Sequence, residues 1–263
     1  MYTTHFKMSA QPFCERAPIE QILKDDRIQQ GLARLQYFLE YSTIAMIVGQ
    51  TGVGKSTLIK LFVNSLSPNR YRPVYIHFTK MKNTCLLKLI ACELGEQPKI
   101  GKDRVLGQII EKTPKSEQTV LLILDESHLL ESDSLTDLRL LVSSALDAEP
   151  PLKLLLVGQE SIQKKLQSDQ HTDLFQRITV RYHLRPLTKE QTIDYIDDQI
   201  SHAGASEKIF EPEVKQAIFE YTYGVPRQIN NVASACLLKA CEKKTQKINQ
   251  ALFMQTMAEF SVH

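Results

Sequence analysis

The sequence Gly49-Gln50-Thr51-Gly52-Val53-Gly54-Lys55-Ser56 decides the fold of this chain. Apolar residues 44–48 precede it, and residues 57–62 follow it with the spacing of a helix. The order strand, glycine-rich loop, helix is that of a phosphate-binding loop, in which glycines let backbone N–H groups turn toward phosphate oxygens. An accidental turn would have to reproduce every fixed position and both flanking patterns. The stretch therefore predicts that the chain binds a nucleoside triphosphate.

Two side chains of this loop have separate predicted roles. Lys55 is expected to reach the β- and γ-phosphate oxygens, and the Ser56 hydroxyl is expected to ligate Mg²⁺. ATP and Mg²⁺ are therefore the expected cofactors. The predicted nucleotide-binding residues of the loop are Gly49, Gln50, Thr51, Gly52, Val53, Gly54, Lys55, Ser56 and Thr57.

Composition places the chain among soluble globular proteins, because 43% of its 263 residues are hydrophobic and 24% are charged. The longest apolar stretches, such as residues 120–124 and 152–157, are too short to cross a bilayer. Residues 1–21 lack the pattern of a secretory signal. We therefore expect a cytoplasmic protein without a membrane partner. The net charge of +2 implies that any affinity for nucleic acid depends on local clusters of basic residues.

Strand-like and helix-like patterns alternate between residues 44 and 183, which predicts an α/β fold with a parallel sheet covered by helices on both faces. The nucleotide would then lie at the carboxyl ends of the strands. The expected strands are residues 44–48, 74–78, 120–124, 152–157 and 178–184. The expected helices between them are residues 56–65, 84–94, 104–112, 134–146 and 161–167.

After Arg185-Pro186-Leu187 the pattern is helical alone. Thr188 can cap the first of these helices, with Gln191 at the reciprocal capping-box position. The sequence thus predicts three parts. They are an N-terminal segment that packs on the nucleotide site (1–43), an α/β ATPase core (44–186) and a small helical lid (187–263).

Asp125 and Glu126 follow the buried strand of residues 120–124. Asp125 can hold Mg²⁺, and Glu126 can orient and polarise the attacking water, which are two requirements of phosphoryl transfer to water. A strand that ends in a pair of charges is common in itself. Its place about 70 residues after a complete phosphate loop favours the magnesium and water site.

Gln159 ends the stretch Val157-Gly158-Gln159. If this strand neighbours the strand before the phosphate loop, the Gln159 amide would lie beside the γ-phosphate and report its presence. The alternative is an ordinary glutamine in a turn.

Three arginines are candidates for contact with phosphate. Arg227 follows Pro226 at a predicted helix start and would project toward the nucleotide of its own subunit. Arg177 would instead reach the nucleotide of a neighbouring subunit and stabilise developing charge, with Arg181 as the substitute for that role. For each arginine the alternative is a surface ion pair.

These motifs together resemble the AAA+ ATPases. More narrowly they are similar to the ExeA-type family (general secretion pathway protein A) and its transposition relatives of the TnsC and TniB kind. The stretches that carry this resemblance are residues 1–6 with Pro12-Phe13, the phosphate loop, residues 124–128, Val157-Gly158-Gln159, Arg185-Pro186-Leu187-Thr188, and Gly224-Val225-Pro226-Arg227-Gln228-Ile229-Asn230.

The resemblance also implies how the ends of the chain act. It places Phe6 and Phe13 near the adenine, although both can equally be anchors that tie the N-terminus to the core. Secretion members carry a membrane span and a cell-wall-binding region after the ATPase, whereas this sequence ends at His263. This difference favours the compact, cytoplasmic transposition relatives.

Relatives of the transposition type form rings or helical filaments that wrap duplex DNA through a loop after the second strand. The resemblance carries this role onto residues 77–84, with Thr79, Lys80 and Lys82 as expected phosphate contacts, and Lys102 is a further basic candidate. Binding would be largely independent of DNA sequence. Solvated lysines in ordinary loops are the alternative.

The sequence therefore predicts an ATP-dependent, DNA-binding regulator of transposition that forms homo-oligomers, recruits a transposase and is disassembled by slow hydrolysis. One alternative is a secretion or envelope assembly ATPase that works through a separate membrane partner. Another is a nucleotide-gated scaffold that does not bind DNA.

Overall fold

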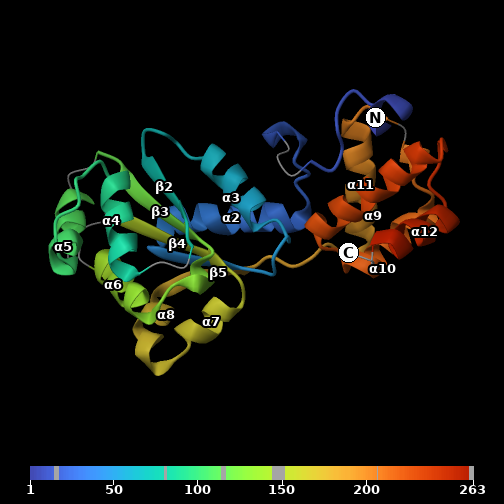
Figure 1. Ribbon diagram of the computed structural model, residues 1–263. Helices are drawn as coiled ribbons and strands as arrows, with labels where there is room; N and C mark the ends of the chain where they lie inside the picture. The colour runs from blue at the N-terminus through green and yellow to red at the C-terminus, as the bar shows by residue number, and fades with distance from the viewer. Residues whose placement is uncertain (15–17, 80–81, 114–116, 144–151, 206, 261–263) are drawn as a thin grey trace. The chain divides into compact units, whose positions relative to one another are not determined.

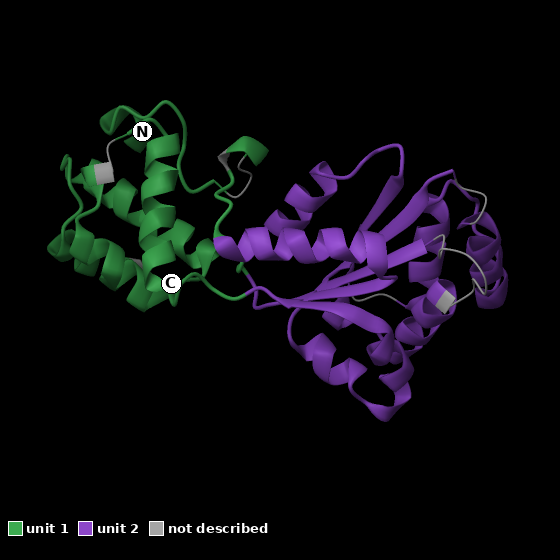
Figure 2. Ribbon diagram, turned by 180° about the vertical axis from the view of Figure 1, so that it is seen from behind, with its two compact units in different colours: residues 1–25, 52–54, 185–263 green, residues 26–51, 55–184 purple. Residues whose placement is uncertain are grey.

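The computed structural model describes residues 1–14, 18–79, 82–113, 117–143, 152–205 and 207–260 (Figure 1). The chain forms two compact units, which Figure 2 colours separately. Residues 26–51 and 55–184 make up the α/β unit, and residues 1–25, 52–54 and 185–263 make up the helical unit.

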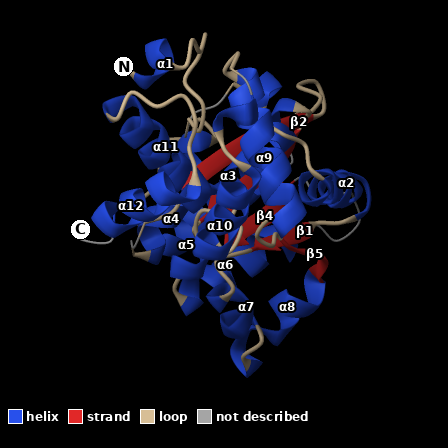
Figure 3. Ribbon diagram, turned by 90° about the vertical axis from the view of Figure 1, so that its right-hand side faces the viewer, coloured by secondary structure: helices blue, strands red, loops and turns tan. Residues whose placement is uncertain are grey.

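A parallel sheet is the centre of the α/β unit, and its strands are red in Figure 3. In the described part of the chain the strand order is β2-β3-β4-β1-β5. Every residue of β1 and β4 is buried, whereas burial alternates along the edge strand β5. Inner parallel strands are covered on both faces, so their residues are mostly apolar, and the buried Lys153 of β4 donates to the Ser42 carbonyl at 2.7 Å. The strands are β1 (Ile44–Val48), β2 (Tyr71–His77), β3 (Thr119–Asp125), β4 (Leu152–Gly158) and β5 (Ile178–His183).

Helices cover both faces of this sheet, as the alternating pattern predicts. Ile44, Met46 and Val48 share one hydrophobic core with leucines and isoleucines of α4 to α8. On the other side, α2 lies against β1 and β5 and beside α3. The sequence patterns did not predict α2. The helices are α2 (Asp26–Tyr41), α3 (Lys55–Asn64), α4 (Asn83–Glu93), α5 (Lys102–Lys112), α6 (Ser132–Ser143), α7 (Ser161–Leu166) and α8 (Thr172–Arg177).

The strand register brings the predicted motifs to one edge of the sheet. Val48, at the end of β1, pairs with Gly158 of β4, and the Gly49 N–H donates to the Gly158 carbonyl at 3.2 Å. Asp125 ends β3, the neighbour of β4. The phosphate loop, the Asp125-Glu126 pair and Gln159 therefore all follow strands that end at this edge, which confirms the parallel α/β fold.

In its described residues, the helical unit has four longer helices around its own core. Thr188 caps α9 with the predicted capping box, in which its hydroxyl accepts from the Gln191 N–H at 3.2 Å. Ile196, Phe210 and Ile229 are among the buried core residues. None of the helices in the described residues is long and apolar enough to cross a membrane. The helices are α9 (Lys189–His202), α10 (Pro212–Thr222), α11 (Pro226–Glu242) and α12 (Gln250–Phe260), with the short N-terminal α1 (Tyr2–His5).

Residues 1–43, which the sequence patterns leave as one segment, are divided between the two units. Residues 1–25 belong to the helical unit, and α2 belongs to the α/β unit. Phe6 and Phe13 are buried in the core of the helical unit, where the Phe13 ring meets the Phe210 ring edge to face at 6.3 Å. The Phe13 N–H also donates to Gln199 Oε1 at 3.2 Å. These contacts support the anchoring interpretation, and a contact with adenine stays a prediction.

Gly224 joins two of the motifs inside the helical unit. The Leu187 N–H donates to the Gly224 carbonyl at 2.8 Å, and Gly224 has a φ of +72°. A methyl group added at Gly224 would lie 1.9 Å from the Leu187 carbonyl oxygen. The stretches around Leu187 and Pro226 therefore meet through a position that only glycine can fill.

Candidate nucleotide site

The phosphate loop has the backbone that its sequence predicts. Gly52 and Gly54 have φ values of +82° and +107°, which side chains other than glycine rarely adopt. Lys55 begins α3 and is buried, and its Nζ donates to the carbonyls of Gly49 at 2.8 Å and Gln50 at 3.0 Å. Backbone N–H groups at a helix N-terminus, together with an ammonium group, suit a chain of phosphates.

Asp125 is the buried acidic centre of the site, with 1% of its surface exposed. The Ser56 hydroxyl donates to its Oδ2 at 3.3 Å, and the Tyr75 hydroxyl donates to the same oxygen at 2.7 Å. Burial, together with the hydrogen bond to this carboxylate, raises the pKa of Tyr75. Hydroxyl and carboxylate oxygens are the ligands that Mg²⁺ prefers. The donor set of Ser56 and Asp125 therefore fits the expected ion.

Glu126 follows Asp125 in a left-handed backbone conformation, with φ 56° and ψ 31°. Such a conformation is uncommon for residues other than glycine and is often found at functional sites. Its side chain is 30% exposed, and its Oε2 lies 3.3 Å from Nδ1 of His128. The carboxylate thus directly follows the predicted magnesium ligand Asp125 and remains open to water, as a group that activates water must.

Gln159 follows β4, and β4 is the neighbour of β1. The structural condition set for Gln159 from the sequence is therefore met, while its contact with the γ-phosphate stays a prediction. The end of β4 packs tightly on the turn after Glu126. A methyl group added at Gly158 would lie 2.9 Å from Ser127 Oγ and 3.0 Å from the His128 backbone nitrogen.

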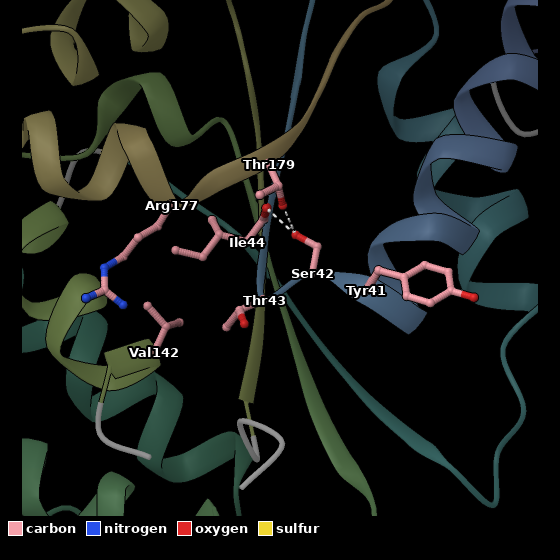
Figure 4. Close-up of a pocket in the computed structure, with 7 residues that line it drawn as sticks. All are labelled: Tyr41, Ser42, Thr43, Ile44, Val142, Arg177 and Thr179. Atoms are coloured by element: carbon pink, nitrogen blue, oxygen red, sulfur yellow. Dashed lines mark hydrogen bonds between the residues drawn. The ribbon is translucent and has the colours of Figure 1, made fainter. Parts of the chain in front are cut away.

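Arg177 ends α8 and lies at the amino ends of the strands, whereas the phosphate loop follows the carboxyl end of β1. It lines a pocket of about 210 Å³ beside the amino ends of β1 and β5. Figure 4 shows its side chain with Ser42, Thr43 and Thr179 around this pocket. Within the α/β unit, Arg177 is separated by the length of β1 from Gly49, which follows the carboxyl end of that strand, and this separation is compatible with the predicted action on a neighbour. That action stays a prediction.

Arg181, the substitute for Arg177, is held within its own segment. Its guanidinium carbon lies 3.8 Å from the centre of the Phe175 ring, and Nη2 donates to the Phe175 carbonyl at 2.7 Å. Its Nε also donates to the Ile178 carbonyl at 3.1 Å. These contacts favour Arg177 over Arg181 for a role in contact with another molecule.

Arg227 is exposed and is the second residue of α11, after Pro226 at the predicted helix start. Its backbone N–H donates to the carbonyl of Gly52 at 3.2 Å, and both residues belong to the helical unit. The predicted contact of its side chain with phosphate is not tested by these observations and stays a prediction.

The four predicted DNA contacts have different surroundings. Thr79 and Lys82 are exposed, and Lys80 lies outside the described residues. Lys102 Nζ lies 3.0 Å from Oδ1 of the buried Asp137. Asn83 donates to the other oxygen of Asp137 at 2.7 Å. Lys102 therefore has a structural partner, and Thr79 and Lys82 are the better candidates for DNA contact among the described residues.

Sequence reasoning missed three residues around the site. Tyr75 and His77 alternate along β2, and both face Asp125, with His77 Nδ1 at 3.8 Å from Oδ2. His128 stands two residues after Glu126. Tyr75 and His77 carry a usable signal, because residues two apart on a strand lie on the same face of the sheet and β2 ends beside Asp125 of β3.

Comparisons with known proteins agree with this geometry. Residues 39–166 match the model of the AAA domain family. The chain is 28% identical over 256 residues to general secretion pathway protein A of Aeromonas hydrophila, and the match covers 94% of this chain and 46% of that relative. This chain thus spans about half of that relative's length.

Solved structures share the fold at low sequence identity. The Aeropyrum pernix ORC2 protein (ADPNP–ADP complexes) has a TM-score of 0.71 and 16% identity, over 94% of this chain and 70% of that one. The Aeropyrum pernix ORC1 protein in complex with DNA has a TM-score of 0.66 and 15% identity, over 92% and 67% of the two chains. Residues 39–166 therefore match the AAA domain family, the chain has the fold of an AAA+ P-loop NTPase, and it is similar to general secretion pathway protein A.

Proposed function

We propose that the chain is an ATP-binding and ATP-hydrolysing switch that serves secretion or assembly of the cell envelope. The observation that carries the nucleotide chemistry is the contact between Ser56 Oγ and Asp125 Oδ2 at 3.3 Å, next to the partly exposed Glu126. The phosphate loop, the proposed magnesium ligand Asp125 and the carboxylate of Glu126 all follow strands that end at one edge of the sheet. Hydrolysis of a nucleoside triphosphate requires these groups to lie together.

Each residue has a defined task in this proposal. Lys55 and the N–H groups of residues 49–57 bind the phosphates, and Ser56 and Asp125 hold Mg²⁺, which neutralises charge on the phosphate oxygens when bound. Glu126 orients a water molecule and accepts its proton on a carboxylate oxygen. Gln159 reports whether the γ-phosphate is present.

The proposal also includes contacts beyond the α/β unit. Arg227 binds phosphate of the same chain, and Arg177 acts on the nucleotide of a second copy. ATP would then order a homo-oligomer, and hydrolysis would release it. The exposed position of Arg177 supports this reading, because a buried or internally paired arginine could not leave for a partner.

The similarity to general secretion pathway protein A favours a task in secretion over the transposition role expected from the motifs. The partner in this reading is a separate membrane component, reached from the cytoplasm, where ATP is available. The motifs alone favour transposition over secretion, whereas the similarity to general secretion pathway protein A favours secretion.

Duplex DNA remains the second candidate partner, with a transposase as the protein that an ATP-bound oligomer would recruit. Two observations favour it. Thr79 and Lys82 are exposed and follow β2 at the nucleotide edge of the sheet, and the ORC1 protein, which has the same fold, was solved in complex with DNA. Binding through such residues would be sensitive to salt and largely independent of sequence.

The test uses the purified chain with Lys55→Ala and Glu126→Gln variants. We expect Lys55→Ala to abolish binding of a fluorescent ATP analogue. We expect Glu126→Gln to bind it normally and to hydrolyse ATP about 10²-fold more slowly, because the amide cannot accept a proton. Normal hydrolysis by Glu126→Gln would contradict the proposed chemistry.

The two partner classes are separated by adding plain duplex DNA with a non-hydrolysable ATP analogue. A nucleotide-dependent complex that weakens with salt, and that is lost in Lys82→Glu, would favour the DNA reading. A duplex that forms no complex with the protein, with or without nucleotide, would favour the secretion function.

A further inference from the structure

His128 lies in the turn directly after Glu126, and the rest of the fold holds this turn closely. Ser127–Leu129 form one turn of 3₁₀ helix. Lys165 Nζ of α7 donates to the His128 carbonyl at 3.1 Å, and Gly158 of β4 leaves no room for a side chain against Ser127 and His128. The His128 side chain is 13% exposed, so the imidazole has a fixed and mostly buried place.

Two different groups meet one nitrogen of this imidazole. Glu126 Oε2 lies 3.3 Å from Nδ1, and the backbone N–H of Gln159 is directed at the same Nδ1 at 3.4 Å. A ring nitrogen carries either a proton or a free lone pair. With a proton, Nδ1 can donate to the Glu126 carboxylate. With a lone pair, it can accept from Gln159, and it cannot do both at once.

A hydrogen-bond donor would restrict the position of the Glu126 carboxylate, which is otherwise free to move. Its side chain has several rotatable bonds, is 30% exposed and starts from a left-handed backbone. A carboxylate has two oxygens, so a donor on Oε2 leaves Oε1 able to accept a proton from water. A misplacement of about 1 Å in a catalytic group can cost about 10²-fold in rate.

We propose that His128 is a positioning residue for Glu126 and that it connects the carboxylate to the end of β4. Nδ1 donates to Glu126 and fixes the carboxylate for its work on water. Gln159 stands at the predicted γ-phosphate position, and its N–H competes for the same nitrogen. A shift at the end of β4 therefore changes how firmly Glu126 is held. This role rests on the proposed hydrolysis of ATP.

Three variants test the role through steady-state ATP hydrolysis. His128→Ala removes the donor, so we expect kcat to fall about 10-fold or more while KM for ATP changes by less than about 3-fold. His128→Asn places an amide N–H near the position of Nδ1, so it should restore most of kcat. His128→Gln places its amide nearer the position of Nε2, so it should not.

The control is His202→Ala, which removes an exposed histidine 3.1 Å from a carboxylate on α9 and should leave both constants unchanged. Unchanged kcat in His128→Ala, or equal activity of the Asn and Gln variants, would overturn the role. A wild-type chain that binds ATP but does not hydrolyse it would overturn the proposed function and this role together. Normal wild-type hydrolysis with unaffected His128 variants would overturn the role alone.

Discussion

Gly224→Ala is expected to be among the most destabilising single-methyl changes in the helical unit. The added methyl group would lie 1.9 Å from the Leu187 carbonyl oxygen, far inside van der Waals contact, so the backbone must move. Overpacking of this kind costs about 1–3 kcal/mol. The movement also weakens the hydrogen bond between the Leu187 N–H and the Gly224 carbonyl, which contributes about 1 kcal/mol. The φ of +72° adds about 1–2 kcal/mol for an alanine.

Gly204→Ala is the matched control in the same unit. Gly204 has a φ of +78°, so it carries the same backbone cost, but its added methyl would meet the Ser9 hydroxyl, which can rotate away. We expect Gly224→Ala to lower the free energy of unfolding by about 2–4 kcal/mol more than Gly204→Ala. Urea denaturation followed by circular dichroism measures both. Equal losses in the two variants would refute the close approach of Gly224 and Leu187.

Three further predictions concern single side chains. Burial raises the pKa of Cys236 to about 12, so a thiol reagent at pH 8 should leave this thiol unmodified in the folded protein. The three exposed cysteines should react, and mass spectrometry of the labelled protein identifies which cysteines are modified. Tyr75→Phe removes a donor from Asp125 and should weaken Mg²⁺-dependent ATP hydrolysis about 3- to 30-fold without loss of thermal stability; unchanged rates would contradict a supporting role. Lys102→Ala leaves the buried Asp137 with one partner fewer and should lower stability by about 1–3 kcal/mol in thermal unfolding, whereas a solvated lysine would give no change.

The α/β unit is largely predictable from sequence, because its inner strands are mostly apolar and helical patterns lie between them. The first edge strand shows the limit of that reasoning. It was expected to start at residue 74, yet β2 starts at Tyr71 and includes Pro73. A proline lacks an N–H, so it is tolerated in an edge strand, where one side of the backbone needs no partner. Pattern alone did not reveal which strand lies at the edge.

The helix of residues 26–41 was missed for a different reason. Its buried face includes Ile28, Leu35 and Phe38, whose spacing is helical, but these residues lie in a segment assigned to the N-terminal part as a whole.

The candidate site was predictable where one motif carries the chemistry, and less so where two segments meet. The phosphate loop with Asp125 and Glu126 follows from local sequence and strand order. The pairing of Lys102 with Asp137, and the meeting of Glu126 and Gln159 at His128, depend on contacts between distant parts of the chain. No local pattern encodes those contacts, because they arise from packing after the sheet has formed.

The left-handed backbone at Glu126 limits which residues can replace it over evolution or in the laboratory. Asparagine, aspartate and glycine adopt this conformation readily, whereas alanine and β-branched residues do so at a cost. A loss of activity in an alanine variant would therefore mix a distorted turn with a missing carboxylate. Position 126 is thus constrained both by its backbone conformation and by its chemistry. A substitution can keep the left-handed backbone and still remove the carboxylate that hydrolysis requires.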